Sequence, residues 1–255
     1  MTAIIVKGRS GGGFTPKDIS ALFAWYQDDS IFRGNSGSSA IGWADLSNNK
    51  NDAFESNSSN RPSIAFNQIN QKSVVRFSSN NVNQLVTPNT GINLETSEFS
   101  FVVVAKIPTP TTGQVGAFIT NRPFQQGTSW FSFGVANNTG LGNPINKVLV
   151  ERFTSAGVYN VYVSNYTPNN TFAIYTLVKQ NNALNIYVNG YNVFSLSGVN
   201  TGGGTNLSVP WRIGNWFDNN QNLNADIPFF CIYNKALLGQ EQSQIENYIA
   251  SRYAF

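Results

Sequence analysis

The feature that most restricts the fold is a run of three segments, residues 172–196, in which β-branched and aromatic residues alternate with polar ones. The first two segments are separated by Asn181-Asn182, and the last two are joined by Asn189-Gly190. Asn-Gly between alternating segments is the strongest short hairpin signal, because both residues of the turn need positive φ. The sequence therefore predicts three consecutive antiparallel strands in this region.

Further strand-like segments recur at intervals typical of a β-sandwich or barrel. Residues 99–107 are apolar on both faces, which predicts a strand in the middle of a sheet. Pro228 suits the first residues of a strand or an edge strand, because proline cannot donate a ladder hydrogen bond. The predicted strands are 21–27, 73–77, 99–107, 115–120, 129–135, 147–153, 172–178, 184–188, 191–196 and 227–233.

Helical signals appear at two places only. Thr15-Pro16-Lys17-Asp18 combines a capping threonine, a proline at the first helical position and an acid three residues after the threonine, which predicts one helical turn. Apolar residues recur at helical spacing near the C-terminus, which predicts an amphipathic helix from about Gln240 to Arg252. No linker follows residue 14, so we predict one all-β domain, residues 15–255, ending in this helix.

Residues 1–14 differ from the rest of the chain. Thr2–Val6 is β-prone and is followed by a flexible glycine-rich tether, residues 7–13. Two interpretations remain open: an arm that docks on a neighbouring subunit, and a disordered leader. Residues 3–6 are too short for a secretory signal, and no apolar stretch approaches the roughly 20 residues that cross a bilayer.

The composition excludes several classes of function. The chain has no histidine and one cysteine, so histidine catalysis, histidine-ligated metals, an internal disulfide and multi-cysteine zinc sites are excluded. Cys231 lies in an apolar run, where it is expected to be a small buried hydrophobe. The 16 lysines and arginines are scattered singly, without the basic stripe that nucleic-acid binding requires.

Several short motifs form a set that spans residues 15–253. They are Asp18–Tyr26, Trp43-Ala44-Asp45-Leu46-Ser47-Asn48-Asn49-Lys50-Asn51-Asp52-Ala53, Arg61-Pro62, Val74-Val75-Arg76-Phe77, Phe99–Lys106, Ile186–Gly190, Ile213-Gly214, Ala225–Ile227, Tyr233–Leu237, Glu241 and Ile245–Ile249. Together they resemble laminin-G-like, concanavalin A-like lectin/glucanase domains of the type found in phage structural and bacterial surface proteins. Asn48-Asn49 departs from the usual Gly-Asn, and Leu238 stands where a helix-capping serine or aspartate is usual.

This resemblance implies a jelly-roll (concanavalin A-like) sandwich of two antiparallel sheets. It does not fix the function, because the fold carries lectins, glycosidases and structural proteins alike. Glycosidases on this fold use two carboxylates about 5–9 Å apart, which on one strand requires i and i+2 spacing. None of the 13 acids forms such a pair, and Asp28-Asp29 would point in opposite directions on a strand. We therefore predict no catalytic residues.

Metal and carbohydrate sites depend on polar loops. The loops 45–52 and 218–226 supply the oxygens that Ca²⁺ prefers, but turn-capping side chains explain them equally well, so no metal ligand is assigned and Ca²⁺ remains an open alternative. Sugar binding needs an exposed aromatic face with amides and carboxylates nearby. The candidate carbohydrate-binding residues are Trp216, Asp218, Asn219, Asn220, Tyr166 and Trp130. In the competing interpretation Trp216 packs on the core, as Trp25, Trp43 and Trp211 are expected to do.

The first functional hypothesis is a non-enzymatic virion spike on the particle surface. Residues 1–13 would attach it to capsid or other virion proteins, and the lectin-like domain would bind host-surface glycans without nucleic-acid binding or membrane insertion. A homo-oligomer is expected, by analogy a trimer, because repeated copies add avidity. The alternatives are an extracellular or cell-surface bacterial carbohydrate-binding adhesion module, and a divergent glycosidase.

Overall fold

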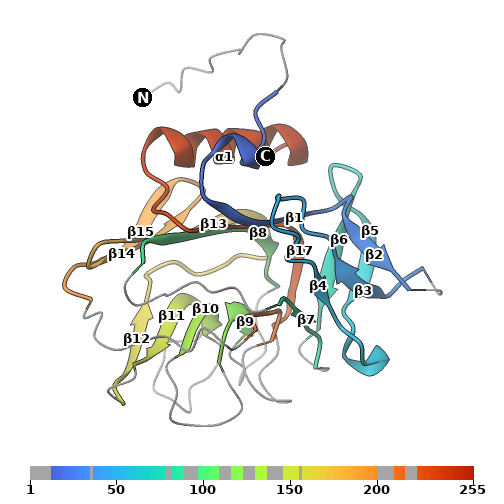
Figure 1. Cartoon of the computed structure of the whole chain (residues 1–255), viewed down its shortest axis with the longest axis horizontal. Coiled ribbons are helices and arrows are strands. Elements are labelled where there is room, and N and C mark those ends of the chain that lie inside the picture. The colour runs from blue at the N-terminus through green and yellow to red at the C-terminus, as the bar shows by residue number, and fades with distance from the viewer. Residues whose placement is uncertain are drawn as a thin grey trace.

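The computed structural model describes residues 13–34, 37–78, 82–88, 97–108, 116–122, 130–136, 146–154, 157–199, 210–215 and 223–255. Two antiparallel sheets face each other, and one helix covers the outer side of the first sheet (Figure 1). This arrangement confirms the predicted sandwich with a C-terminal helix. Residues 1–12 lie outside the described residues, so the division of the chain at residue 14 stays a prediction.

The first sheet, sheet A, has the order β15–β14–β13–β8–β17–β6–β5, and β1 also pairs with β17. Its strands are β1 (Leu22–Gln27), β5 (Ser63–Ile69), β6 (Lys72–Phe77), β8 (Phe99–Lys106), β13 (Phe172–Gln180), β14 (Ala183–Val188), β15 (Tyr191–Leu196) and β17 (Ala225–Tyr233). The predicted hairpin is confirmed: Asn189 and Gly190 join β14 to β15 with φ of 49° and 78°.

The second sheet, sheet B, has the order β12–β11–β10–β9–β16–β7–β4–β3–β2. Its strands are β2 (Ile31–Arg33), β3 (Ala40–Trp43), β4 (Ala53–Phe54), β7 (Leu85–Val86), β9 (Gly116–Thr120), β10 (Trp130–Ala136), β11 (Lys147–Phe153), β12 (Tyr159–Val163) and β16 (Arg212–Ile213). The remaining elements are the short helices η1 (Pro16–Asp18) and η2 (Ser58–Asn60) and the helix α1 (Gln240–Tyr253). The predicted strands include neither β5 nor β12, which are edge strands with few buried residues, nor the short strands β2, β3, β4, β7 and β16.

The core has two layers, and β8 contributes to both. Phe101 and Val103 lie in the layer between the sheets, whereas Val102 and Val104 lie between sheet A and α1. Alternate residues of a strand point to opposite faces, so a strand that is apolar on both faces belongs where both faces are covered. The prediction of a central strand at this position is thereby confirmed.

The tryptophans expected in the core are buried. Trp43 and Trp211 lie between the sheets and Trp25 lies under α1. Cys231 is also buried, and this burial raises the pKa of its thiol well above the ordinary value. Within the described residues, no helix has the length and apolarity that a membrane crossing requires.

The position of Pro228 differs from the sequence expectation. β17 is a central strand, bonded to β8 along one side, and Pro228 is neither at its first residue nor at an edge. On its other side, β17 pairs with β6 through residues 225–227 and with β1 from Phe229 onward. Pro228 lies where the partner changes and where the register with β8 shifts. A proline is tolerated there because no ladder hydrogen bond needs its missing N–H.

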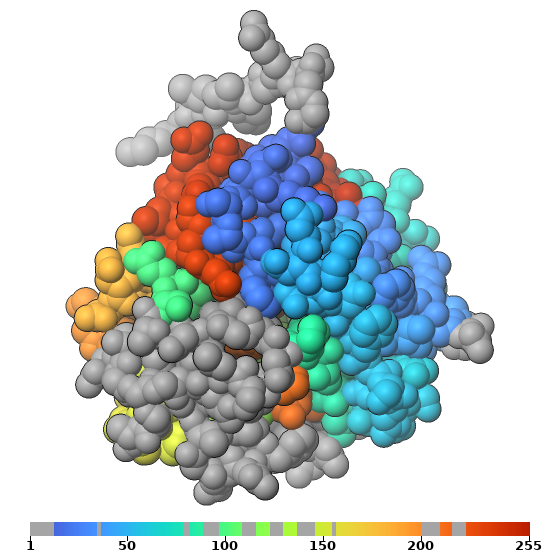
Figure 2. Space-filling model, viewed as in Figure 1, coloured from blue at the N-terminus to red at the C-terminus, as the bar shows by residue number. Residues whose placement is uncertain are grey.

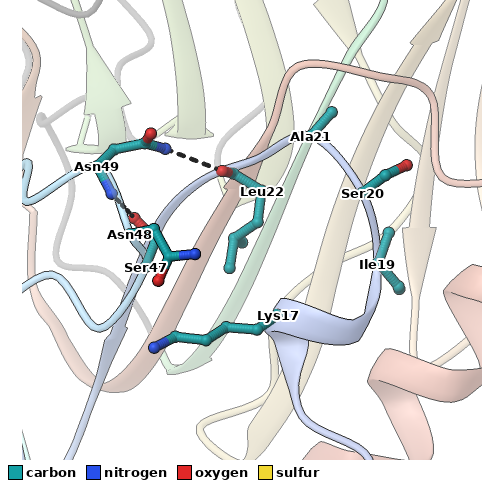
Figure 3. A pocket seen from close by; sticks show the side chains of 8 residues that line it. All are labelled: Lys17, Ile19, Ser20, Ala21, Leu22, Ser47, Asn48 and Asn49. Atoms are coloured by element: carbon teal, nitrogen blue, oxygen red, sulfur yellow. Dashed lines mark hydrogen bonds between the residues drawn. The ribbon is translucent and has the colours of Figure 1, made fainter.

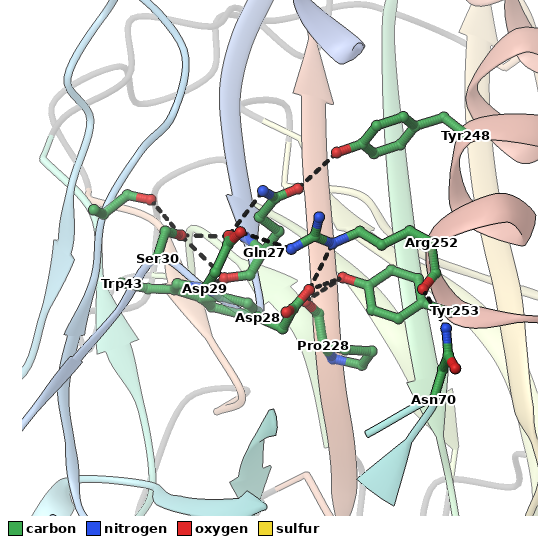
Figure 4. Close-up of polar contacts among 11 residues, drawn as sticks. Gln27, Asp28, Asp29, Ser30, Trp43, Asn70, Pro228, Tyr248, Arg252 and Tyr253 are labelled. Atoms are coloured by element: carbon green, nitrogen blue, oxygen red, sulfur yellow. Dashed lines mark hydrogen bonds and ion pairs between the residues drawn. The ribbon is translucent and has the colours of Figure 1, made fainter. Parts of the chain in front are cut away.

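The turn after β1 holds the end of α1 (Figure 4). Asp28 Oδ1 accepts hydrogen bonds from Arg252 Nε at 2.7 Å and from the Tyr253 hydroxyl at 2.8 Å. Asp29 Oδ2 accepts a second bond from the Arg252 guanidinium at 2.8 Å. The two acids therefore converge on one arginine instead of pointing apart, because they lie in a turn. In the space-filling view, the blue N-terminal part of the domain and the red C-terminal part lie against each other and form one continuous surface (Figure 2).

Candidate functional site

An aromatic cluster lies on the outer face of sheet B. Trp130 on β10, Phe153 on β11 and Tyr159 on β12 are register partners across three neighbouring strands. The Trp130 ring stacks with Phe153 at 6.3 Å between centroids and an angle of 9°, and lies 5.8 Å from the Tyr159 ring. Phe131, the next residue after Trp130, points into the core, so these three rings face away from it.

A cation lies on this cluster. The guanidinium carbon of Arg122, two residues after β9, lies 4.4 Å from the centre of the Trp130 ring. Such cation–π contacts contribute about 0.5–1 kcal/mol at exposed sites and more when desolvated. The Arg122 carbonyl accepts a hydrogen bond from Arg212 on β16 at 2.6 Å. The Arg212 guanidinium therefore lies against the backbone of Arg122 at this edge of the cluster.

A carboxylate fixes the orientation of the outermost ring. The Tyr159 hydroxyl donates a 2.7 Å hydrogen bond to Oε1 of Glu151, which is buried beneath it on β11. Burial and then the charge of Glu151 raise the pKa of Tyr159 well above its ordinary value. The hydroxyl therefore stays protonated and keeps its role as donor. We call Arg122, Trp130, Glu151, Phe153 and Tyr159 the sheet B cluster.

Exposure differs strongly within the sheet B cluster. Tyr159 is 43% exposed and its neighbour Val158 is 50% exposed, whereas Trp130 is 7% exposed beneath Arg122. A ligand would therefore meet Tyr159 first, and Trp130 supports that ring from behind. Of the residues in this cluster, only Trp130 was predicted from the sequence as a carbohydrate-binding residue. The signal for the others was weak: Glu151 interrupts an apolar strand, and Tyr159 belongs to an edge strand with no clear alternation.

Of the other predicted site residues, only Tyr166 is among those that the structure describes. Trp216, Asp218, Asn219 and Asn220 lie outside the described residues, so the proposed loop site is untested. Tyr166 lies on the segment between β12 and β13, and its ring meets the buried Tyr175 edge-on at 6.2 Å. It packs against the core.

The first loop considered for calcium, residues 45–52, is held together by the Asp45 carboxylate, whereas residues 218–222 of the second loop lie outside the described residues. Asp45 Oδ1 accepts from the N–H groups of Trp25 and Ser47, each at 2.8 Å. Its Oδ2 accepts from the Ser47 hydroxyl at 2.6 Å and from the Asn51 N–H at 2.8 Å. These four bonds use the lone pairs that a metal would need. Within the described part of the chain, no group of three or more acidic or cysteine residues is placed to hold a metal ion.

A shallow polar pocket of about 220 Å³ adjoins this loop (Figure 3). Asn49 forms part of its wall and donates hydrogen bonds from Nδ2 to the carbonyls of Leu22 and Phe23. The charged group in the lining is Lys17, a cation. A positive side chain in the lining disfavours a metal ion in this pocket.

Comparison with known proteins shows the fold. No protein-family model and no curated protein sequence matches the chain. The binding domain of Paraclostridial Mosquitocidal Protein 1 superposes with a TM-score of 0.65 at 17% identity, covering 92% of this chain and 53% of that one. The binding domain of botulinum neurotoxin serotype D gives 0.62 at 14% identity, covering 91% and 52%. The binding domain of botulinum neurotoxin DC, in complex with SialylT, gives 0.60 at 15% identity, covering 90% and 52%.

The chain thus spans about half the length of these binding domains. The likeness supports the lectin-like β-sandwich that the sequence motifs implied; the narrower laminin-G-like and phage assignment stays a prediction. At such low identity, what this chain and these domains share is the β-sandwich fold.

Proposed function

We propose that the chain is a non-enzymatic carbohydrate-binding module whose ligand site is the sheet B cluster. The observation that carries the proposal is the geometry of Tyr159, whose ring is 43% exposed while its hydroxyl is fixed by Glu151 and its side lies against Trp130. A preorganised aromatic face binds the apolar face of a sugar ring at little entropic cost.

Positive charge beside the cluster supports an acidic sugar as the ligand. The Arg122 guanidinium lies on the Trp130 ring and the Arg212 guanidinium lies at the Arg122 carbonyl, and guanidinium groups bind carboxylates in a two-pronged geometry. The botulinum neurotoxin DC binding domain, which shares the fold, was solved with SialylT. A glycan on a host surface is therefore the partner that we propose for this chain.

The carboxylates support binding over hydrolysis. Glu151 is engaged by the hydroxyl of Tyr159, while hydrolysis of a glycosidic bond uses two carboxylates on either side of it. Asp28 and Asp29, the adjacent acids of the chain, are bound by Arg252 at the helix end. Their shared role is to hold α1, which accounts for the pair without a reaction.

Replacing Tyr159 with alanine is expected to weaken glycan binding at least tenfold, which corresponds to about 1.4 kcal/mol. The ligand is first identified on a glycan array with the whole chain, and affinities are then measured by calorimetry. Tyr191→Ala is the matched control, because Tyr191 is a 78% exposed tyrosine on β15 of the other sheet. Tyr159→Phe should retain most of the binding, since it keeps the ring. Unchanged binding by Tyr159→Ala, or an equal loss in both alanine variants, would refute this site.

The finer proposal is that the module is a virion spike, attached through residues 1–13 and present in several copies in a homo-oligomer, by analogy a trimer. Deleting residues 1–13 is then expected to abolish incorporation into particles, because the tether precedes the packed domain. Thermal melting provides the control: the midpoint should stay unchanged, since Phe14 onward keeps its contacts with α1. Normal incorporation of the truncated chain would refute the role of residues 1–13 in attachment.

A further inference from the structure

An open pocket of about 420 Å³ lies on the other side of the sandwich, between α1 and the turn that joins β14 to β15. Its size falls within the roughly 300–1,000 Å³ typical of pockets for small molecules. It is lined by Ile174, Asn189, Glu246, Asn247, Ala250 and Phe255. Three of these side chains are apolar and three are polar, a composition typical of a site that both holds and orients a ligand.

The half-buried carboxylate of Glu246 has no cationic partner among the residues that the structure describes. Its hydrogen-bond partner is Gln242 Nε2, 3.2 Å from Oε1, and no ion pair of the described residues includes it. Glu241, on the same helix, is paired with Lys235 at 2.6 Å. Burial raises the pKa of Glu246 above its ordinary value. Taking a carboxylate partly out of water without a positive partner costs free energy, which a bound cation would offset.

The carboxylate lies against the turn between β14 and β15. A Cβ atom on Gly190 would lie 2.8 Å from Oε2 of Glu246, so the two groups are in close contact. The neighbouring Asn189 exchanges hydrogen bonds with Ile174: its N–H donates to the Ile174 carbonyl at 2.9 Å, and its Oδ1 accepts from the Ile174 N–H at 2.8 Å. These bonds leave the Nδ2 donors of Asn189 available in the pocket.

We propose that this pocket binds an amino sugar, a hexosamine with a free ammonium group. The ammonium pairs with Glu246, the ring hydroxyls bond the amides of Asn189 and Asn247, and the apolar face of the sugar rests on Phe255, which is 50% exposed. A lysine side chain would satisfy the carboxylate but leave both amides without a partner, which favours the sugar. This pocket lies on the outer side of sheet A, so the inference does not depend on the sheet B cluster.

The test titrates the whole chain with glucosamine at neutral pH, and NMR spectra of the chain report the binding. Glucosamine is expected to bind at least tenfold more tightly than N-acetylglucosamine, in which a neutral amide replaces the ammonium. Glu246→Gln should weaken glucosamine binding at least tenfold. The thermal melting midpoint of the Glu246→Gln variant should equal or exceed that of the parent chain, because the substitution removes an uncompensated charge without changing the size of the side chain.

Two variants serve as controls. Glu241→Gln should bind glucosamine as the parent does, because that carboxylate already has Lys235 as its partner. Tyr159→Ala should also bind normally, which separates this site from the proposed glycan site. The inference is overturned by unchanged binding in Glu246→Gln, by equal affinity for N-acetylglucosamine, or by a lysine derivative that binds as tightly as glucosamine.

Discussion

Replacing Gly214 with alanine is expected to lower the free energy of unfolding by about 4 kcal/mol. A Cβ atom at this position would lie 1.9 Å from Cδ1 and 2.0 Å from Cε1 of Phe77, and the backbone has a φ of +88°. Phe77 is fully buried between the sheets and cannot move aside. Overpacking a core costs about 1–3 kcal/mol, and a strained backbone conformation of this kind costs about 1–3 kcal/mol more.

Gly157→Ala separates these two causes. Gly157 has a φ of +78°, close to that of Gly214, but nothing lies within 4 Å of a Cβ atom built there. Its substitution should cost only the backbone strain, about 1–2 kcal/mol. Both variants are measured by urea unfolding followed by tryptophan fluorescence. If the two alanines destabilise the chain equally, then the contact with Phe77 does not contribute to the effect.

Replacing Arg252 with methionine is expected to lower the free energy of unfolding by about 3–5 kcal/mol, the usual cost of leaving a buried charge without its partner. The Asp28 side chain is 6% exposed and would lose the guanidinium that lies 2.7 Å away. The Tyr253 hydroxyl would still donate a hydrogen bond to Asp28, so the variant is expected to remain folded. Urea unfolding measures the change directly.

Arg76→Met is the matched control for Arg252→Met. Arg76 pairs with Asp226, whose side chain is also 6% exposed, but Lys106 lies 3.5 Å from the same carboxylate. Asp226 would therefore keep one cation, and the loss should be clearly smaller than for Arg252→Met. Equal losses in the two variants would contradict the assignment of Arg252 as the main cation for Asp28.

The contact of Arg252 with Asp29 predicts that the stability of the fold depends on pH. Burial alone would raise the pKa of Asp29, but hydrogen bonds from Arg252 and Gln27 hold it below its ordinary value. A carboxylate with a lowered pKa in the folded state stabilises the fold above its unfolded pKa, about 3.9. That stability is lost as the pH falls through the folded pKa. The Arg252→Met variant should therefore lose less stability than the parent when the pH is lowered from about 5 to 3.

Local patterns were sufficient for most of the strands. The Asn189-Gly190 turn, the doubly apolar strand at Phe99–Lys106 and the amphipathic C-terminal helix each follow from a few neighbouring residues, and each is confirmed. The missing helix cap also followed from the sequence, because Leu238 stands where a capping serine or aspartate is usual. In the structure Gly239 is the N-cap residue of α1, and it provides no side-chain hydrogen bond. Pro228 was misplaced because its tolerance depends on the strands that pair on either side of it.

The candidate sites were much less predictable. The sheet B cluster joins Arg122, Trp130, Glu151 and Tyr159 from different strands, through a register that no local pattern contains. The contact between Asp28 and Arg252 joins residues 224 positions apart. Glu246 looked like an ordinary polar residue of a surface helix until the fold placed it against Gly190.

The sequence by itself therefore determined the elements: which segments become strands, where the chain turns, and that the chain ends in a helix with one apolar face. These properties depend on backbone preferences and on the alternation of side chains, which act over a few residues. Only the tertiary structure decided which side chains meet. A shift of one residue in strand pairing would move every side chain to the opposite face, so the positions of Tyr159 and of Glu246 depend on the packing of the whole domain.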